Sequence, residues 1–161
     1  MLGSWLYSLD ARIHNGKAEV QFDNLPTVGY CPSTFRVFME NLIDNGIKFN
    51  NNPKPVIQIT HQIENGFLKL MISDNGIGIE EKFQKKIFEM FTRLHNRSEY
   101  SGSGMGLSYC KKALNLKGET ISVKSEIGKG TTFTVRLRTK AAQNYANSSS
   151  SLTSHQPSIT Q

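Results

Sequence analysis

Residues 56–74, with the sequence VIQITHQIENGFLKLMISD, carry the clearest secondary-structure signal in the chain. Apolar and polar side chains alternate on both sides of Asn65-Gly66. This dipeptide favours a type I′ turn, in which two antiparallel strands are joined by two residues of positive φ. The sequence therefore predicts a β-hairpin whose second strand ends at Asp74.

The remaining elements follow from the same patterns. Pro32 and Ser33 suit the first turn of a helix, which must end before the prolines of residues 50–55. We expect further strands at 18–22, 119–126 and 131–139, and further helices at 80–91 and 107–116. Because the strands come mostly in antiparallel pairs and the helices can share one face, we predict an α/β fold. Its form would be a two-layer α/β sandwich with a mixed, mostly antiparallel sheet.

The two ends of the chain differ from its middle. Residues 1–16 have apolar side chains at nearly helical spacing, which indicates the end of a linker helix from an upstream dimerisation domain that this sequence lacks. Residues 141–161 are rich in Ser, Gln, Asn and Thr, which predicts a disordered tail. Residues 17–140 would then form one domain.

Composition excludes several classes of protein. The formal net charge is +6, but the lysines and arginines are scattered, so we expect no nucleic-acid partner. No apolar stretch reaches the length of a membrane span, and no basic leader precedes the apolar start. We expect no direct membrane contact and a cytoplasmic location, whether or not the parent protein is anchored elsewhere. Cys31 and Cys110 lack the spacing of a zinc site or a disulfide framework.

Asn41, Asn45 and Lys48 share one stripe of the predicted helix at 32–49. Amide oxygens are hard ligands, and Mg²⁺ takes a few of them while keeping waters and phosphate oxygens. A nearby ammonium group offsets phosphate charge. Taken alone, however, the triplet is more typical of a solvated helix face.

Two glycine-rich motifs follow. In DNGIGI, residues 74–79, Asp74 ends a strand and two glycines permit close backbone approach. The carboxylate can therefore accept a hydrogen bond from an exocyclic amine. The same residues are equally consistent with a plain surface turn. In GSGMGL, residues 102–107, a loop opens a helix, where backbone N–H groups favour phosphate. It follows no strand and there is no GxxxxGK[ST], which disfavours a dinucleotide fold and a P-loop.

The order of these motifs is more specific than any one of them. The asparagine helix, DxGxG, the Phe-containing helix at 80–91, GxGxGL and the GxGTxF hairpin at 128–133 occur in this order in the ATP-binding domain of sensor histidine kinases. The chain strongly resembles this domain, a member of the GHKL superfamily, from about residue 18 to 138. The resemblance implies a Bergerat fold that binds ATP and Mg²⁺, with an ATP lid at 93–103.

The resemblance also implies roles for individual residues. Asn45 would coordinate Mg²⁺, Asn41 would support metal or phosphate, and Lys48 would reach a phosphate, which makes these three the catalytic set. Asp74 would bind the adenine amino group beside Phe49, with help from Thr131 through water. The other nucleotide-binding residues would be Gly76, Gly78, Ile79, Phe88, Gly102, Gly104, Met105, Gly106 and Leu107.

The same resemblance bears on the reaction. In hydrolytic relatives such as type II topoisomerases and Hsp90 chaperones, a glutamate four residues before the metal asparagine activates water. Here that position is Asn41, and Glu40 should point about 100° away. We therefore expect a histidine kinase domain that transfers the γ-phosphoryl group to a histidine on the dimerisation domain. The alternative is an ATP-sensing interaction module without phosphotransfer; a hydrolytic ATPase is disfavoured.

The resemblance further implies a response regulator as a partner and a monomeric domain. None of His14, His61, His95 and His155 carries a predicted catalytic role. The sequence departs from the family pattern at Gly46, where alanine is usual, at a cost of about 1 kcal/mol of helix stability. It also has Gly118-Glu119 in place of a Gly-Gly pair, which we expect to be a change at the surface.

Overall fold

The computed structural model describes residues 18–22, 30–94 and 104–139, which form an open sheet with helices packed against it. The sheet has five strands in the order β1-β2-β3-β5-β4. Their bounds are β1 (Glu19–Phe22), β2 (Val56–Glu64), β3 (Phe67–Asp74), β4 (Thr120–Glu126) and β5 (Gly130–Arg138). Only β1 and β2 pair in parallel, and the other three pairs are antiparallel. The expected mixed, mostly antiparallel sheet is confirmed.

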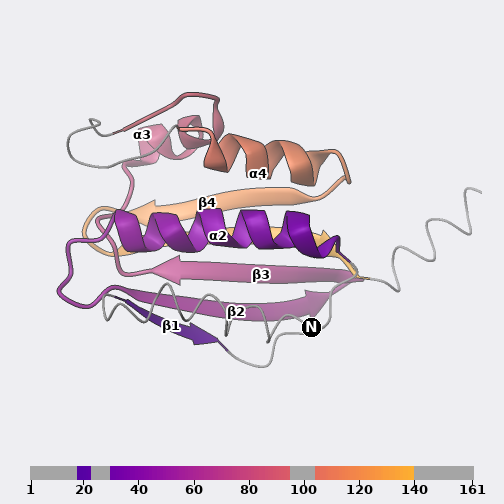
Figure 1. Ribbon diagram of the computed structural model, residues 1–161, viewed down its shortest axis with the longest axis horizontal. Helices are drawn as coiled ribbons and strands as arrows, with labels where there is room; N and C mark the ends of the chain where they lie inside the picture. The colour runs from indigo at the N-terminus through magenta and orange to yellow at the C-terminus, as the bar shows by residue number, and fades with distance from the viewer. Residues whose placement is uncertain (1–17, 23–29, 95–103, 140–161) are drawn as a thin grey trace, which may run out of the picture.

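Within the described residues, four helical segments lie on one side of this sheet. They are α2 (Pro32–Lys48), α3 (Glu81–Gln84), the 3-10 helix η1 (Lys86–Phe88) and α4 (Gly106–Asn115). Figure 1 shows α2 running along the strands, between β3 and β4 in this view, with α4 on the far side of β4. The predicted two-layer α/β sandwich is therefore confirmed.

The hairpin is as predicted. Asn65 and Gly66 have φ angles of 50° and 76°, the positive values that a type I′ turn requires. Alternate β3 residues face the helices, so Leu68, Leu70 and Ile72 are buried. They meet the apolar stripe of α2, which buries Phe35, Phe38, Met39, Leu42 and Ile43. This packing fixes the last turn of α2 near the end of β3.

The predicted helix at 80–91 is wrong in length. The structure has one short helix over Glu81–Gln84 and a 3-10 turn over Lys86–Phe88. Ile87 and Phe88 of this turn are both buried, so the chain stays packed against the core here although it does not continue as an α-helix. Phe91, with φ of 62°, turns the chain away from helical geometry altogether.

The expectation that Glu119 is a surface residue is also wrong. Its side chain is only 2% exposed, and Oε1 accepts the backbone N–H of Arg138 at 3.2 Å. The reason is the turn after α4, where the Glu119 N–H donates to Leu114 O and folds the chain back over the helix end. Burial raises the pKa of this carboxyl, although the Arg138 N–H and the Lys117 charge partly oppose the shift.

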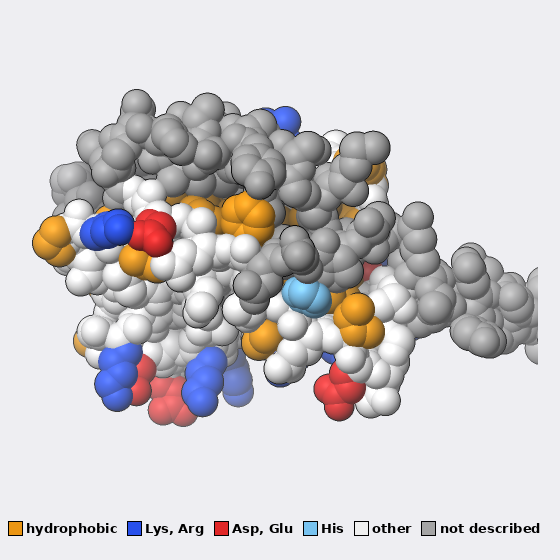
Figure 2. Space-filling view, turned by 90° about the horizontal axis from the view of Figure 1, so that it is seen from below, with side chains coloured by type: hydrophobic (Ala, Val, Ile, Leu, Met, Phe, Trp, Pro, Cys, Tyr) orange, Lys and Arg blue, Asp and Glu red, His pale blue; other side chains and the backbone are white. Residues whose placement is uncertain are grey.

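Several expectations lie outside the described residues. These are the linker helix at 1–16, the tail at 141–161, His14, His95, His155, Gly102 and most of the lid. The parts of the chain that are described contain no helix long and apolar enough to cross a membrane. On the face in Figure 2, basic and acidic side chains lie beside one another. Lys54 and Glu19 form one such ion pair in the structure.

Candidate functional site

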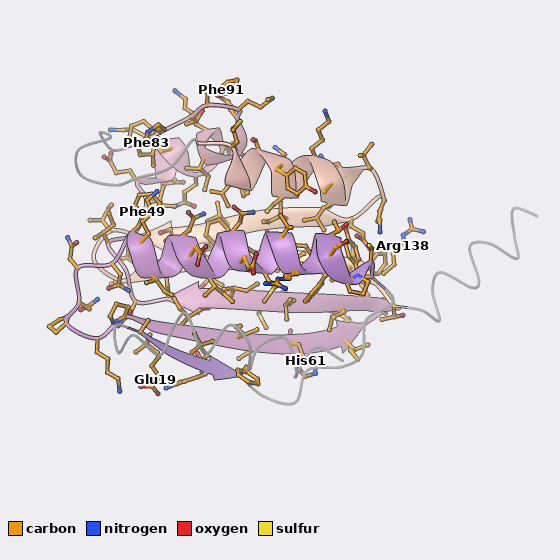
Figure 3. All side chains as sticks on the ribbon, viewed as in Figure 1. Glu19, Phe49, His61, Phe83, Phe91 and Arg138 are labelled. Carbon is orange, nitrogen blue, oxygen red and sulfur yellow. The ribbon has the colours of Figure 1, made fainter. Side chains whose placement is uncertain are left out.

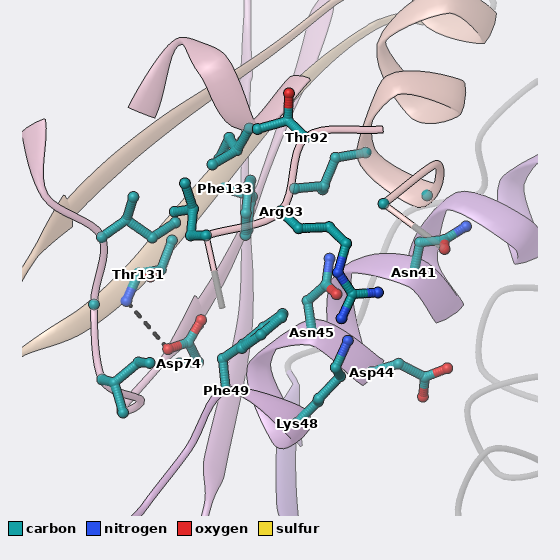
Figure 4. A pocket seen from close by; sticks show the side chains of 18 residues that line it. Asn41, Asp44, Asn45, Lys48, Phe49, Asp74, Thr92, Arg93, Thr131 and Phe133 are labelled. Carbon is teal, nitrogen blue, oxygen red and sulfur yellow. Dashed lines mark hydrogen bonds between the residues drawn. The ribbon is translucent and has the colours of Figure 1, made fainter. Parts of the chain in front are cut away.

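A cavity of about 300 Å³ opens where the end of α2, the end of β3 and the start of α4 meet (Figure 4). The segments that surround it are far apart in sequence, but the packing of α2 on the sheet brings them together. Eleven predicted site residues line it: Asn41, Asn45, Lys48, Phe49, Asp74, Gly78, Ile79, Gly104, Gly106, Leu107 and Thr131. The cavity thus gathers residues from the asparagine helix and all three glycine motifs.

Three predicted residues do not line the cavity. Gly76 lies behind Asp74, to which its N–H donates. Met105 is 43% exposed, and Phe88 is buried edge-on against Phe133 with ring centroids 6.4 Å apart. Phe88 therefore supports the wall of the cavity through Phe133, which does line it.

The carboxylate of Asp74 is held in one orientation. The N–H groups of Gly76 and Thr131 both donate to Oδ1, at 2.8 and 3.2 Å. Among the described residues, Oδ2 receives no hydrogen bond, so it is left to accept one from a ligand. Burial raises the pKa of Asp74, and the two N–H donors partly offset that shift.

Close backbone contacts explain two of the glycines. A Cβ on Gly76 would collide with the carbonyl oxygen of Phe49, to which the Ile77 N–H also donates at 3.0 Å. A Cβ on Gly130, which has φ of 99°, would collide with the carbonyl oxygen of Asp74. The loop after β3 is therefore pressed against both the end of α2 and the start of β5.

One end of the cavity is positively charged. Lys48 lies with Nζ 4.4 Å from the centre of the Phe49 ring, and the Arg93 guanidinium lies near it (Figure 4). Burial and the charge of Arg93 both lower the pKa of Lys48. Two cations beside the Asn45 amide are suited to a polyanion.

The start of α4 closes this end. A Cβ on Gly106 would collide with Oδ1 of Asn41, so the Asn41 side chain can hold its present position only beside a glycine. Asn41 in turn donates from Nδ2 to Val37 O at 2.8 Å. Met105, the N-cap of α4, makes no side-chain cap hydrogen bond, which leaves the first N–H groups of the helix for an anion.

Sequence analysis missed part of the lining, namely Asp44, Ile77, Ile87, Thr92, Arg93, Leu94 and Phe133. Arg93 and Leu94 were assigned to the lid and not to the site itself. The alternation of β5 places Phe133 on the same face as Thr131, which is a signal that the sequence does contain. His61, for which no catalytic role was predicted, lies on β2, well away from Phe49 (Figure 3).

The side chains that line the cavity are suited to Mg²⁺ as a ligand set with few protein donors. No cluster of three or more His, Cys, Asp or Glu side chains occurs within residues 18–22, 30–94 and 104–139. The cavity instead offers the Asn45 amide beside two cations. This set fits an ion that takes few protein ligands and completes its shell with water and phosphate oxygens.

Comparison with known proteins assigns the family. Residues 32–141 match the family described as histidine kinase-, DNA gyrase B-, and HSP90-like ATPase. The chain belongs to this ATPase family. A solved nucleotide-free catalytic domain of the histidine kinase ThkA has the same fold, with a TM-score of 0.70, 23% identity, and coverage of 84% of this chain and 89% of that one.

Two curated relatives of this ATPase-family domain are much longer proteins. Cyanobacterial phytochrome A of Nostoc sp. is 41% identical over 129 residues, which cover 80% of this chain and 17% of that protein. The signal transduction histidine-protein kinase ArlS of Staphylococcus aureus is 36% identical over 135 residues, covering 78% of this chain and 30% of that protein. The domain therefore corresponds to less than a third of either relative.

Proposed function

We propose that this domain binds Mg·ATP and transfers its γ-phosphoryl group to a histidine on a dimerisation domain of the same parent protein. The observation that carries the proposal is the meeting of Asp74 and Asn45 in one cavity. They come from the end of β3 and the last turns of α2. Membership of an ATPase family and similarity to a named histidine kinase support this assignment.

The apolar end of the cavity would hold the adenine. Asp74 Oδ2 would accept a hydrogen bond from the exocyclic amino group, the only amine on the base. Phe49 would contact the ring, while Ile79 and Phe133 supply apolar surface around it. Few polar groups in a mostly apolar pocket are typical of such sites, because the polar groups fix orientation and the apolar ones exclude water.

The positively charged end would hold the triphosphate. Lys48, Arg93 and the start of α4 all face this end, where they offset negative charge. Asn45 would hold Mg²⁺, which when bound supplies further charge neutralisation on the phosphates. The role of the protein side chains is to position the γ-phosphoryl group and to stabilise its charge.

Among the described residues of the cavity, an amide stands where a hydrolytic relative would have its base. Asn41 cannot take a proton, and its amide already donates to Val37 O. Glu40 forms an ion pair with Arg36 at 3.0 Å on the outer side of α2. Asp44 lies at the rim and points away from Asp74 and Phe49 (Figure 4). The nucleophile would therefore come from another domain.

A phosphotransfer assay tests the proposal. The chain is mixed with a separately produced helical domain that carries a phosphoacceptor histidine, in the presence of Mg·ATP. The expected product is an acid-labile phosphohistidine on the helical domain. ATP binding without such a product would contradict phosphotransfer and favour the ATP-sensing module, and steady ATP turnover by this chain alone would instead indicate a hydrolytic ATPase.

The proposed partners extend this function. A response regulator would receive the phosphoryl group from the histidine, and the domain would work in the cytoplasm. Dimerisation would depend on the other domain, so this chain should sediment as a monomer. A stable dimer at micromolar concentration in analytical ultracentrifugation would overturn the expected monomeric state.

A further inference from the structure

Three asparagines that do not line the cavity form a connected cluster beside it, which we call the asparagine clip: Asn50, Asn52 and Asn75. Asn75 Oδ1 accepts hydrogen bonds from Asn50 Nδ2 at 2.7 Å and from the backbone N–H of Val56 at 2.8 Å. Asn52 donates from Nδ2 to the carbonyl oxygen of Asn75. The clip thus joins the loop after α2, the start of β2 and the loop after β3.

The members of the clip are next to residues of the cavity in sequence. Asn75 directly follows Asp74, and Asn50 directly follows Phe49. Asn50 Nδ2 also donates to Gly46 O at 3.3 Å, so it is tied to the last turn of α2. The clip therefore connects the backbone beside Asp74, the predicted hydrogen-bond acceptor for adenine, to the backbone beside Phe49, the predicted contact of the adenine ring.

We infer that the asparagine clip is a positioning element that sets the selectivity of the site for adenine; this inference rests on the proposed function. The selectivity depends on where Asp74 Oδ2 lies relative to a base held by Phe49. Asp74 ends β3 and Phe49 follows α2, and the Asn50–Asn75 hydrogen bond helps to set the relative position of these two segments, together with the Ile77 N–H bond to Phe49 O. Because the geometry of a single acceptor decides the outcome, a shift of about 1 Å is enough to lose discrimination.

The direction of the hydrogen bond is fixed by its surroundings. The backbone N–H of Val56 can only donate, so the atom of Asn75 that it meets is an acceptor oxygen. Asn50 must then donate its NH₂ group to that same oxygen. An aspartate at position 75 keeps both accepted bonds and loses only the 3.3 Å bond that Asn75 Nδ2 donates to Lys54 O. An aspartate at position 50 instead places an oxygen against the Asn75 oxygen and against Gly46 O. A role that depended only on side-chain volume would not distinguish these two substitutions.

The test compares the affinity of the chain for ATP and for inosine triphosphate. Inosine carries a carbonyl oxygen where adenine has its amino group, and an N–H at the adjacent N1. The ratio of the two affinities therefore reports on contacts at this edge of the base, where Asp74 is the predicted partner. The parent should prefer ATP. Asn75→Ala and Asn50→Ala should each reduce this preference about tenfold, which corresponds to the loss of one half-buried hydrogen bond. Asn115→Ala, at the far end of α4, is the matched control and should keep the parent ratio.

Two further variants sharpen the result. Asn75→Asp should keep most of the ATP preference, and Asn50→Asp should lose at least as much as Asn50→Ala. The double variant Asn50→Ala/Asn75→Ala should lose less than the two single variants added together, because both remove the bond that the two residues share. Thermal unfolding of each variant identifies those that fail to fold. The comparison of Asn75→Asp with Asn50→Asp then decides whether the direction of the Asn50–Asn75 hydrogen bond sets the selectivity.

The outcomes separate this inference from the proposed function. If the parent binds ATP and inosine triphosphate equally, the assignment of Asp74 to adenine is wrong, and the clip has no selectivity to set. If the parent prefers ATP but the variants lose affinity for both nucleotides in the same proportion, the clip is merely structural. Equal ratios for Asn75→Asp and Asn50→Asp would also overturn the inference.

Discussion

Asp74 and Thr131 are direct partners across β3 and β5, and the Thr131 N–H donates to Asp74 Oδ1 at 3.2 Å. With the Gly76 N–H at 2.8 Å, this contact orients the carboxylate before any ligand binds. A side chain that is already held in place loses little conformational freedom when it meets a ligand. The sheet register therefore prepares the predicted adenine contact.

The substitution Asp74→Asn should weaken ATP binding at least tenfold. The two N–H donors require an oxygen on their side, so the new NH₂ group would face the adenine amino group, and two donors would oppose each other. Calorimetric titration with Mg·ATP measures the loss. Glu64→Gln, on the exposed end of β2, is the control, and affinity equal to the parent in Asp74→Asn would remove Asp74 from the site.

The substitution Asn45→Ala should abolish the dependence of ATP affinity on Mg²⁺. The amide oxygen is the protein ligand that we assign to the ion, so its loss should matter only when Mg²⁺ is present. The measurement is the ratio of ATP affinities with Mg²⁺ and with a chelator. A variant that retains the parent ratio would show that another residue holds the metal.

The substitution Gly106→Ala should disturb the site. The added methyl group would collide with Asn41 Oδ1, so the Asn41 side chain has to turn away and give up its hydrogen bond to Val37 O. The loss of one such hydrogen bond costs about 0.5–1.5 kcal/mol of the free energy of unfolding. Urea denaturation and ATP titration should both report the change, while Lys112→Ala on the exposed side of α4 should not. Unchanged stability and affinity would mean that the position of the Asn41 side chain does not matter to the site.

Glu119 should make stability depend on pH. Burial raises its pKa in the folded state above the unfolded value of 4.5, so folding favours the protonated form. The stabilising contribution is then complete below about pH 4.5 and is lost as pH rises through the folded pKa. Relative to the parent, Glu119→Gln should therefore become more stable as pH increases from 4 to 8.

Urea denaturation across this pH range measures the effect. Each unit by which the pKa is raised corresponds to about 1.4 kcal/mol. The same substitution at the exposed Glu81 is the control. A constant difference in unfolding free energy between Glu119→Gln and the parent would contradict the burial of an ionisable carboxyl at this position.

Local patterns were enough to predict the hairpin and the order of the elements. Asn65-Gly66 fixes the turn by backbone sterics alone, and the alternation of β3 follows from its one buried face. The lengths of α3 and η1 were not predictable, because the break at Gln84 depends on tertiary contacts. Its side chain donates to Ile79 O and Ser125 O, on two other segments.

In the candidate site, too, some features follow from local sequence patterns and others depend on tertiary contacts. Asn45 and Asp74 were found from motifs in which residue type and spacing already imply the chemistry. The burial of Glu119 and the asparagine clip were not, because both arise from contacts between turns that no local pattern encodes. Arg93 illustrates an intermediate case, since its position after the helix was visible but its approach to Lys48 depends on the fold.

The most direct test of the site is a titration of the isotope-labelled chain with Mg·ATP, followed by amide NMR. The N–H groups of Gly76 and Thr131 both donate to Asp74 Oδ1, so their signals report any ligand that engages this carboxylate. The account predicts that both signals shift with ATP and shift much less with inosine triphosphate. Signals that do not move, or that move equally with both nucleotides, would contradict adenine recognition by Asp74.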